Sequence, residues 1–278
     1  MSCDVLEADE LHRFVPEYYE RNRPVVIRGL PGRFPLKIFR WSAAYFEDVL
    51  GDTPVPVLTT ETGFLSYERD VTPLPYREFT RRSFGRDVAK GVRYYFKNPT
   101  SLLPARHDDS ASLPVLGAYI GRSLLRNLWI SGGGITVGLH FDAAENFNFQ
   151  LKGEKVFDLY PPGVRAYYPM PMFSQTAHIS RVFRKGPDPD LTRFPRFRSE
   201  RVVHVHLKAG EVIYIPAYWW HQVTSLGDEN VNLNCWWLPS PKKQLTHPNQ
   251  ALRGHVQVAL RYFKFGSMQQ APPAKKSA

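Results

Sequence analysis

Hydrophobic and polar residues alternate with a period of two through the middle of the chain and follow helical spacing toward its ends. From Leu124 to Leu238, short alternating runs are separated by Gly, Pro and Asp, which is typical of strands joined by turns. The runs predict eight strands, at 127–131, 136–142, 146–151, 155–160, 201–207, 212–215, 222–225 and 231–237. Eight short strands favour a jelly roll or barrel over a parallel sheet. A Pro- and Arg-rich insert, residues 161–200, interrupts them.

The segments on either side of these strands predict further elements. Before them, the pattern predicts helices at 7–21, 41–50 and 76–84 and strands at 23–30 and 92–96. After them, residues 243–265 have helical spacing, and the Ala-, Pro- and Lys-rich residues 266–278 are expected to be disordered. The chain therefore divides into N-terminal α/β elements over 1–125, a β core over 126–240, a C-terminal helix within 241–265 and a tail.

Composition narrows the class of protein. Hydrophobic residues make up 43% of the chain, but no window approaches the roughly 18 consecutive apolar residues of a membrane span. Two cysteines cannot form a disulfide framework, which fits a reducing compartment. The acidic N-terminus lacks the pattern of a secretory signal, so a cytoplasmic location is expected.

The net charge of +10 is concentrated in two segments. Residues 77–106 contain 8 Lys/Arg against 2 Asp/Glu, and residues 181–208 contain 8 against 3. A concentrated positive charge favours an anionic partner, such as nucleic acid, ribosome, acidic peptide or phosphorylated glycan. The alternative is that these Arg-rich loops only keep the surface soluble.

Three residues of the β region form a candidate metal site. His140 and Asp142 stand on alternate residues of one predicted strand, so both can point to the same face. His221 follows 81 residues later, after enough strands for a barrel to bring it near them. Two imidazoles and one carboxylate hold Fe(II) on one face and leave the other positions open. Taken alone, a His-x-Asp pair is common by chance, and a histidine among aromatics is more often a core residue.

Lys155 is an independent indication of a site. Strand alternation puts it on the same face as Phe157 and Leu159, where a buried ammonium is unfavourable without an anion. Either the strand is turned and Lys155 is solvated, or a carboxylate meets it inside the barrel. Other polar residues share strand faces, either around a site or on an outer solvated surface: Asn146, Asn148 and Gln150, and Asn232 and Asn234.

His204 and His206 also alternate on a predicted strand. No carboxylate accompanies them in that strand, and the surrounding segment is basic, so we expect a surface strand without a metal role.

The motifs resemble the Jumonji-C family of Fe(II)- and 2-oxoglutarate-dependent oxygenases, particularly the small cupin-like hydroxylases related to the asparaginyl hydroxylase that inhibits hypoxia-inducible factor. The resemblance runs from Arg23-Pro-Val-Val-Ile-Arg-Gly29 to Trp237. It is most specific in His140-Phe-Asp-x-x-x-Asn-Phe-x-x-Gln-x-x-Gly-x-Lys155, in Asp188-Pro-Asp-Leu-x-x-Phe-Pro-x-Phe197 and in Gly210-Glu-Val-x-Tyr-Ile-Pro-x-Tyr-Trp-Trp-His221. It implies a mainly β fold with α: a double-stranded β-helix (jelly-roll, cupin-like) core with N-terminal α/β elements and a C-terminal helix.

The resemblance also implies roles for individual residues. His140, Asp142 and His221 would be the iron ligands, and Lys155 would pair with the distal carboxylate of 2-oxoglutarate. The remaining residues of the cosubstrate pocket would be Asn146, Asn234, Trp236 and Tyr95, with Tyr94 as the alternative if the alignment slips by one.

Two features depart from the family pattern. The family often has Thr three residues before the first ligand, whereas Val137 stands there and Thr136 is one step earlier. Either a bulge brings Thr136 to the cosubstrate, or its hydrogen bond is absent. After Trp237 the chain has room for about one helix, where the asparaginyl hydroxylase dimerises through a pair, so dimerisation by that route is not expected and the oligomeric state stays open.

The expected activity is that of a dioxygenase using Fe(II), 2-oxoglutarate and O2 to hydroxylate an amino-acid side chain of a protein or peptide. The alternatives are hydroxylation of a small molecule, a sugar or lipid-linked glycan or a tRNA base, and N-methyl demethylation. A cupin-type binding module without catalysis is the alternative outside the enzymes, because fold does not settle function.

Overall fold

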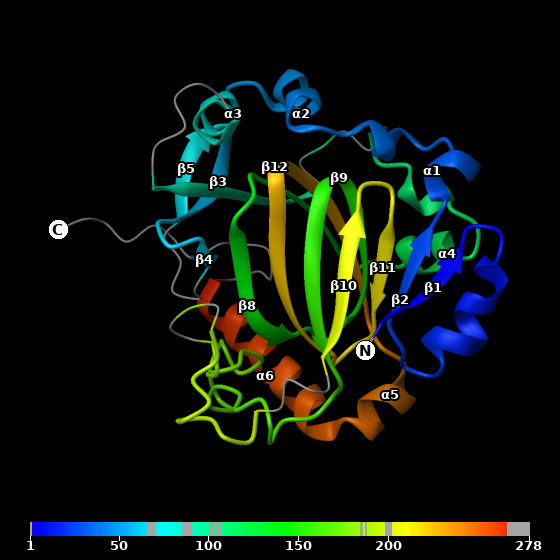
Figure 1. Ribbon diagram of the computed structural model, residues 1–278, viewed down its shortest axis with the longest axis vertical. Coiled ribbons are helices and arrows are strands. Elements are labelled where there is room, and N and C mark those ends of the chain that lie inside the picture. The colour runs from blue at the N-terminus through cyan, green and yellow to red at the C-terminus, as the bar shows by residue number, and fades with distance from the viewer. Residues whose placement is uncertain are drawn as a thin grey trace.

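The fold is a twisted β structure flanked by helices, shown by a computed structural model in Figure 1. The structure describes residues 2–65, 71–84, 91–100, 103, 107–183, 186, 188–197 and 202–265. Within these ranges, no helix has both the length and the apolar character needed to cross a bilayer. The predicted disordered tail, residues 266–278, lies outside the described residues.

The N-terminal half alternates short helices and strands. In chain order its strands are β1 (Asp4–Glu7), β2 (Val25–Arg28), β3 (Pro54–Thr60), β4 (Phe64–Leu65), β5 (Val71–Pro75) and β6 (Arg93–Pro99). Its helices are η1 (Leu11–Arg13), η2 (Val15–Tyr19), α1 (Leu30–Arg33), η3 (Lys37–Arg40), α2 (Ala43–Leu50), α3 (Tyr76–Phe84), η6 (Ser110–Ser112) and α4 (Leu116–Ile120).

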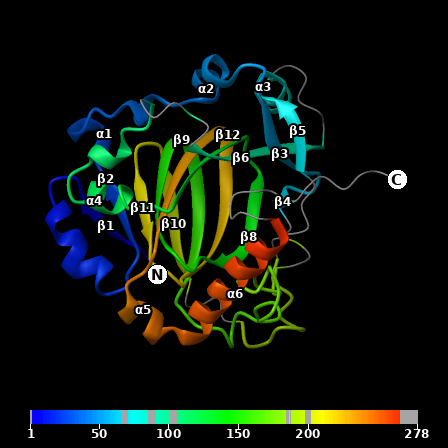
Figure 2. The ribbon, with the colours of Figure 1, turned by 180° about the vertical axis from the view of Figure 1, so that it is seen from behind.

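The C-terminal half carries the core strands and ends in two helices. The strands are β7 (Leu125–Ser131), β8 (Ile135–Phe141), β9 (Glu145–Tyr160), β10 (Val203–Lys208), β11 (Val212–Ile215) and β12 (Trp220–Trp237). The helices are α5 (Pro241–Thr246) and α6 (Pro248–Phe265). Figure 2 shows α6 from behind, at the same end of the strands as the insert that follows β9.

Two long antiparallel strands, β9 and β12, hold the two layers of the barrel together. The first half of β9 and the second half of β12 lie in a sheet with the order β1-β2-β11-β9-β12-β7-β6-β3-β5. Their other halves pair with β10 and β8 in the second layer, where β4 extends β8. β9 passes between the layers at Gly153, whose φ of 74° and closeness to the Glu229 carbonyl allow no side chain.

Apolar residues fill both outer faces at the places where helices or the insert cover them. The N-terminal helices pack on the outer face of the first layer, against residues such as Phe147, Phe149 and Leu233. The insert and α6 pack on the outer face of the second layer, around Phe141 and Trp220. The inner face is apolar near β10 and β11 but carries buried polar residues along β9 and β12.

The predicted jelly-roll fold class is confirmed. The helix predicted at 76–84 forms as α3, and the strand predicted at 23–30 forms over four residues as β2. The helix predicted over 41–50 forms as α2, and the Ser42 hydroxyl caps it by accepting from the Tyr45 amide. The predicted helix at 7–21 is wrong at its start, because Glu7 belongs to β1, which pairs with β2. The C-terminal helix is two helices that separate at His247.

The strand boundaries show two further differences. The pairs predicted at 146–151 and 155–160, and at 222–225 and 231–237, are each one continuous strand, because bulges let β9 and β12 turn between layers without ending. Strands β3, β4 and β5 were not predicted, since prolines occupy four positions of the β3–β5 pair and obscure its alternation.

Candidate metal centre

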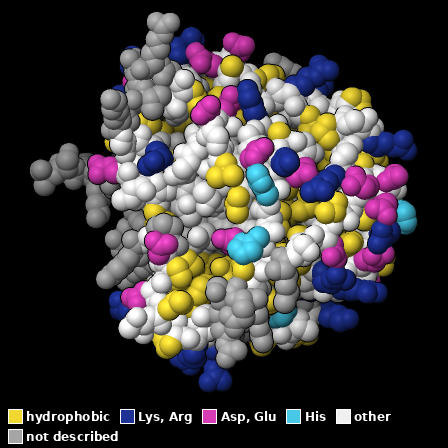
Figure 3. All heavy atoms as spheres, viewed as in Figure 1, with side chains coloured by type: hydrophobic (Ala, Val, Ile, Leu, Met, Phe, Trp, Pro, Cys, Tyr) yellow, Lys and Arg dark blue, Asp and Glu magenta, His cyan; other side chains and the backbone are white. Residues whose placement is uncertain are grey.

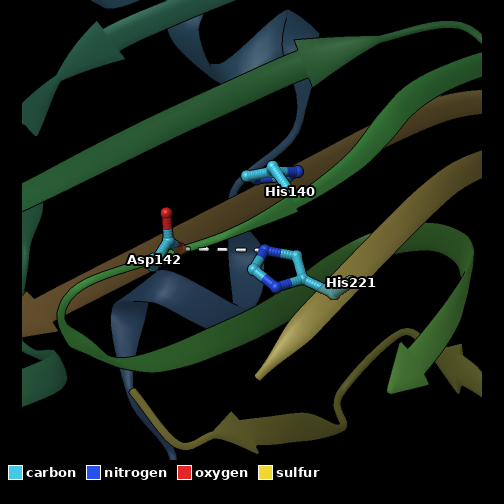
Figure 4. A group of neighbouring side chains, drawn as sticks. All are labelled: His140, Asp142 and His221. Carbon is cyan, nitrogen blue, oxygen red and sulfur yellow. Dashed lines mark ion pairs between the residues drawn. The ribbon is translucent and has the colours of Figure 1, made fainter. Parts of the chain in front are cut away.

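His140, Asp142 and His221 come together where β8, β9 and β12 meet. His140 and His221 are direct partners across the β8–β12 ladder, and Phe141 and Trp220 are the adjacent pair. Because neighbours on a strand face opposite sides, both histidines point inward while both aromatic rings pack outward under the insert. One ligand atom from each of the three residues lies within 4.8 Å of the others. Figure 4 shows the three side chains as neighbours.

Backbone carbonyls set the orientation of both imidazoles. His140 Nδ1 lies 2.8 Å from the Gly138 carbonyl, and His221 Nδ1 lies 3.1 Å from the Trp219 carbonyl. A carbonyl only accepts, so Nδ1 is the donor in each ring, and Nε2 is the nitrogen that would ligate a metal. Trp236 Nε1 donates to Asp142 Oδ2 at 2.9 Å and fixes the carboxylate. This donor set fits a divalent metal such as Fe(II), with ligand-orienting partners on all three residues.

Lys155 lies on the same inner face, farther along β9. It is 3% exposed, and burial alone lowers the pKa of its ammonium to about 7. Its neighbours there are Ser225, its partner on β12, and the Tyr95 ring, whose centroid is 6.0 Å from Nζ. The strand is therefore not turned outward, and a charged Lys155 needs an anion to offset its desolvation.

Carboxamides line the inner face between the metal centre and Lys155. Asn234 Nδ2 donates to Asn146 Oδ1 at 3.0 Å, beside the Asp142 end of β9. Asn232 donates to the carboxamide oxygens of Asn148 and Gln150 one step farther along. The buried polar positions of both strands thus face inward, as expected for a site and not for a solvated surface.

An aromatic wall connects the two ends of this face. The Tyr95 ring lies 5.4 Å from the Trp129 ring, which lies 6.3 Å from the Trp236 ring. The wall therefore runs from Lys155 to the Trp236 indole that binds Asp142. Sequence reasoning missed Trp129 and Ser225, because their only signal is the pairing register: Trp129 pairs with Asn232, and Ser225 pairs with Lys155.

Two of the candidate residues do not lie on this inner face. Thr136 pairs with Thr224, and their hydroxyls are 2.9 Å apart. Thr224 in turn pairs with Val156, whose side chain points away from Lys155, so Thr136 faces outward. A bulge in β8 puts Val137 on the inner face, and the expectation that a bulge brings Thr136 to the site is not met. Tyr94, the alternative to Tyr95, packs in the core on the other side of the sheet.

His204 and His206 lie exposed on the outer face of the second layer. His204 pairs with Asp158 and His206 with Glu154, each at 2.6 Å. The face in Figure 3 exposes histidines beside acidic groups, and its described Lys and Arg side chains are interspersed with Asp and Glu. Basic residues therefore do not form one continuous patch on the described part of this face.

Comparisons with known proteins relate these features to a family. The model of the cupin-like domain matches residues 11–243. The human bifunctional peptidase and (3S)-lysyl hydroxylase JMJD7 is 27% identical over 232 residues, which is 73% of each chain. Lysine-specific demethylase 8 of Xenopus tropicalis is 28% identical over 85% of this chain but only 52% of its own length.

A third relative is the tRNA wybutosine-synthesizing protein 5 of Gallus gallus, which is 26% identical over 82% of this chain and 74% of its own. The family match spans both the N-terminal elements and the strands that carry His140, Asp142 and His221. It agrees with the jelly-roll layers and with the Jumonji-C resemblance of the motifs. The chain therefore belongs to the cupin-like family of 2-oxoglutarate oxygenases.

Proposed function

We propose that this protein is an Fe(II)- and 2-oxoglutarate-dependent dioxygenase that hydroxylates an amino-acid side chain of a protein or peptide. The observation that carries the proposal is the pairing of two features on one inner face. The ligand set His140, Asp142 and His221 stands at one end, with both histidine rings oriented by backbone carbonyls, and the buried Lys155 ammonium stands at the other. A diacid that chelates a metal through one end offers Lys155 its other carboxylate.

In this proposal His140, Asp142 and His221 hold the iron. The bound iron, 2-oxoglutarate and O2 supply an oxidation that converts the cosubstrate to succinate and CO2 and inserts one oxygen atom into a C–H bond. The chain holds these groups in place. Lys155 and Tyr95 bind the distal carboxylate, Asn146 and Asn234 offer amide donors nearer the metal, and the aromatic wall keeps water away from the diacid.

A protein or peptide substrate is favoured by the relatives. JMJD7 is named for lysyl hydroxylation, and the demethylase is named for lysine. Both names describe chemistry on a side chain of a polypeptide, and the first describes hydroxylation. We therefore propose hydroxylation over demethylation for this chain.

The test is substrate-dependent formation of succinate together with a product 16 Da heavier. We expect both when the iron-loaded protein, 2-oxoglutarate and peptides from a cell extract are combined, and neither with Asp142→Ala. His204→Ala is the matched control, because it removes an exposed histidine that also pairs with a carboxylate. Wild-type succinate formation by Asp142→Ala would show that the ligand assignment is wrong. Iron binding without any turnover of 2-oxoglutarate would instead support a binding module.

A polyanionic substrate such as tRNA is the second candidate, favoured by the charge of +10 and by the wybutosine-synthesizing relative. The insert carries exposed Arg193 and Arg196 beside the outer aromatic cluster. If the substrate is an RNA, the double variant to Glu weakens its binding most at low salt and flattens the salt dependence. Activity on a neutral peptide that the double variant leaves unchanged would exclude this candidate.

A further inference from the structure

The turn that leads into His221 has a strained backbone. Tyr218 adopts φ of 72°, a left-handed conformation that a residue with a large side chain rarely takes. Its amide donates to the Asp142 carbonyl at 2.9 Å, so this strained residue links the segments of two candidate ligands. Such a conformation persists only when surrounding contacts hold it. The contacts of Tyr218 and its neighbours therefore bear on where His221 lies.

Helix α6 supplies one of these contacts through Gln250. This side chain is 3% exposed, and both ends of its amide are used. Nε2 donates to the Tyr218 carbonyl at 2.7 Å, and Oε1 accepts from the Gly163 amide at 3.0 Å. Gln250 thus ties the strained residue to the start of the insert.

The same helix touches the segment of the second ligand. A Cβ on Gly254 would lie 2.2 Å from the Cβ of Ala143, the residue directly after Asp142. Only glycine allows so close an approach, so α6 packs against this segment with no room to spare. Gln250 and Gly254 are four residues apart, which places them on one side of the helix. One helix face therefore contacts the neighbours of both Asp142 and His221.

Helix α5 reaches the same turn through a buried ion pair. Lys243 Nζ donates to Glu145 Oε1 at 2.6 Å, and Glu145 is fully buried. Glu145 Oε2 accepts from the Ala217 amide at 3.1 Å and from the Tyr214 hydroxyl at 2.6 Å. A buried ion pair contributes little net stability compared with apolar residues of similar volume. Here the pair connects α5 to Ala217, the residue before Tyr218, and to the start of β9.

We propose that α5 and α6 form a clamp that holds the strained turn, so that metal affinity depends on Gln250, Gly254 and Lys243 although none of them touches the metal. The clamp rests on the proposed metal site but goes beyond it: these three act as positioning residues. Loosening the helices lets Tyr218 relax and moves His221 relative to His140 and Asp142.

The test compares three clamp variants, Gln250→Leu, Lys243→Met and Gly254→Ala, with two exposed controls, Lys242→Met and Asn249→Ala. Co(II) binding to the metal-free protein is followed by visible absorption at a temperature where every variant is folded. We expect the clamp variants to bind Co(II) about 10- to 100-fold more weakly, as for other residues that orient ligands. The controls should stay within about twofold. Gly254→Ala is the sharpest variant, because alanine favours the helix itself while displacing Ala143.

A remote core variant separates positioning from general loss of stability. Phe46→Leu lies in the N-terminal core of the other layer and should lower the melting temperature without changing Co(II) affinity. Amide hydrogen exchange at Ala217 and Tyr218 in the metal-free protein gives a second readout, and we expect about tenfold faster exchange in the clamp variants. Unchanged exchange and unchanged affinity would overturn the clamp, as would an equal loss of affinity in Phe46→Leu. A wild-type protein that fails to bind Co(II) contradicts the proposed metal site, and the exchange rates still decide whether the clamp exists.

Discussion

The proposed pairing of Lys155 with the distal carboxylate predicts that binding of 2-oxoglutarate depends on pH. Burial lowers the pKa of its ammonium from 10.5 to about 7. A difference of this size corresponds to about 5 kcal/mol between the charged and neutral forms. Above pH 7 the ligand-free site therefore holds mostly neutral Lys155, whereas a bound carboxylate requires the charged form. At pH 8 about 0.9 proton should be taken up with each 2-oxoglutarate bound, and affinity should fall about tenfold for each further pH unit.

Calorimetry in buffers of different ionisation enthalpy measures this uptake directly, with Mn(II) in place of iron to prevent turnover. Lys155→Arg keeps its charge at every pH, so any binding that it retains should show no proton uptake at this residue. Lys152→Met is the matched control, since Lys152 lies on the same strand but pairs with Glu229 at the surface. Equal proton uptake in wild type and Lys155→Arg, or an affinity that is flat from pH 7 to 9, would show that Lys155 does not take up this proton.

The same shift has a consequence for stability. The unfolded chain keeps Lys155 protonated up to about pH 10.5, whereas the ligand-free folded protein loses that proton above about pH 7. The free-energy cost of burying the charged Lys155 therefore lowers stability in full below pH 7, and this loss shrinks as pH rises from 7 to 10.5. Lys155→Met should raise the free energy of unfolding of the ligand-free protein by up to about 5 kcal/mol near neutral pH, while removing diacid binding. Urea unfolding at pH 6.5 and 9.5 measures the gain, which should be smaller at the higher pH.

Three further variants test other parts of the structure. Asp142→Ala should lower Co(II) affinity by at least about 100-fold, measured by titration, because a carboxylate ligand is lost; wild-type affinity would contradict its assignment. Trp236→Phe removes the hydrogen bond to Asp142 and should weaken Co(II) binding about tenfold with little change in melting temperature. Gly153→Ala should destabilise the protein by about 2–4 kcal/mol in urea unfolding, because its φ is 74° and a Cβ would lie 2.1 Å from the Glu229 carbonyl; an unchanged midpoint would show that the strand crossing relaxes easily.

Much of the fold followed from alternation, and the reason is visible in particular strands. His140 lies two residues from Asp142, and Lys155 lies two residues from Phe157 and four from Leu159, so the residues that share its face could be identified along each strand separately. Alternation does not show where an extra residue makes the following side chains of a strand change faces. The bulge in β8 reverses Thr136 and Val137, and nothing in that local sequence marks the extra residue.

Contacts between distant segments could not be predicted from the sequence, for a different reason. Glu145 begins a long strand and Lys243 lies in the first turn of a short helix, and each alone looks like an ordinary charged residue near the end of an element. Their pairing depends on how α5 crosses the end of the barrel, and Gln250 depends on the same packing. The polar inner face was recognisable from β9 and β12, whereas Trp129 entered it only through the register of β7.

The continuity of β9 fixes the distance between the proposed metal ligands and Lys155. Leu159 pairs with His221 at the metal end and Lys155 pairs with Ser225 at the other end, so four residues of one strand separate the two ends, about 13 Å along its axis. No loop or hinge lies between these points to adjust that spacing. We therefore expect the protein to distinguish diacids by length, and to bind the five-carbon 2-oxoglutarate better than its four-carbon and six-carbon analogues, which carry the same charges but place the second carboxylate at the wrong distance from Lys155.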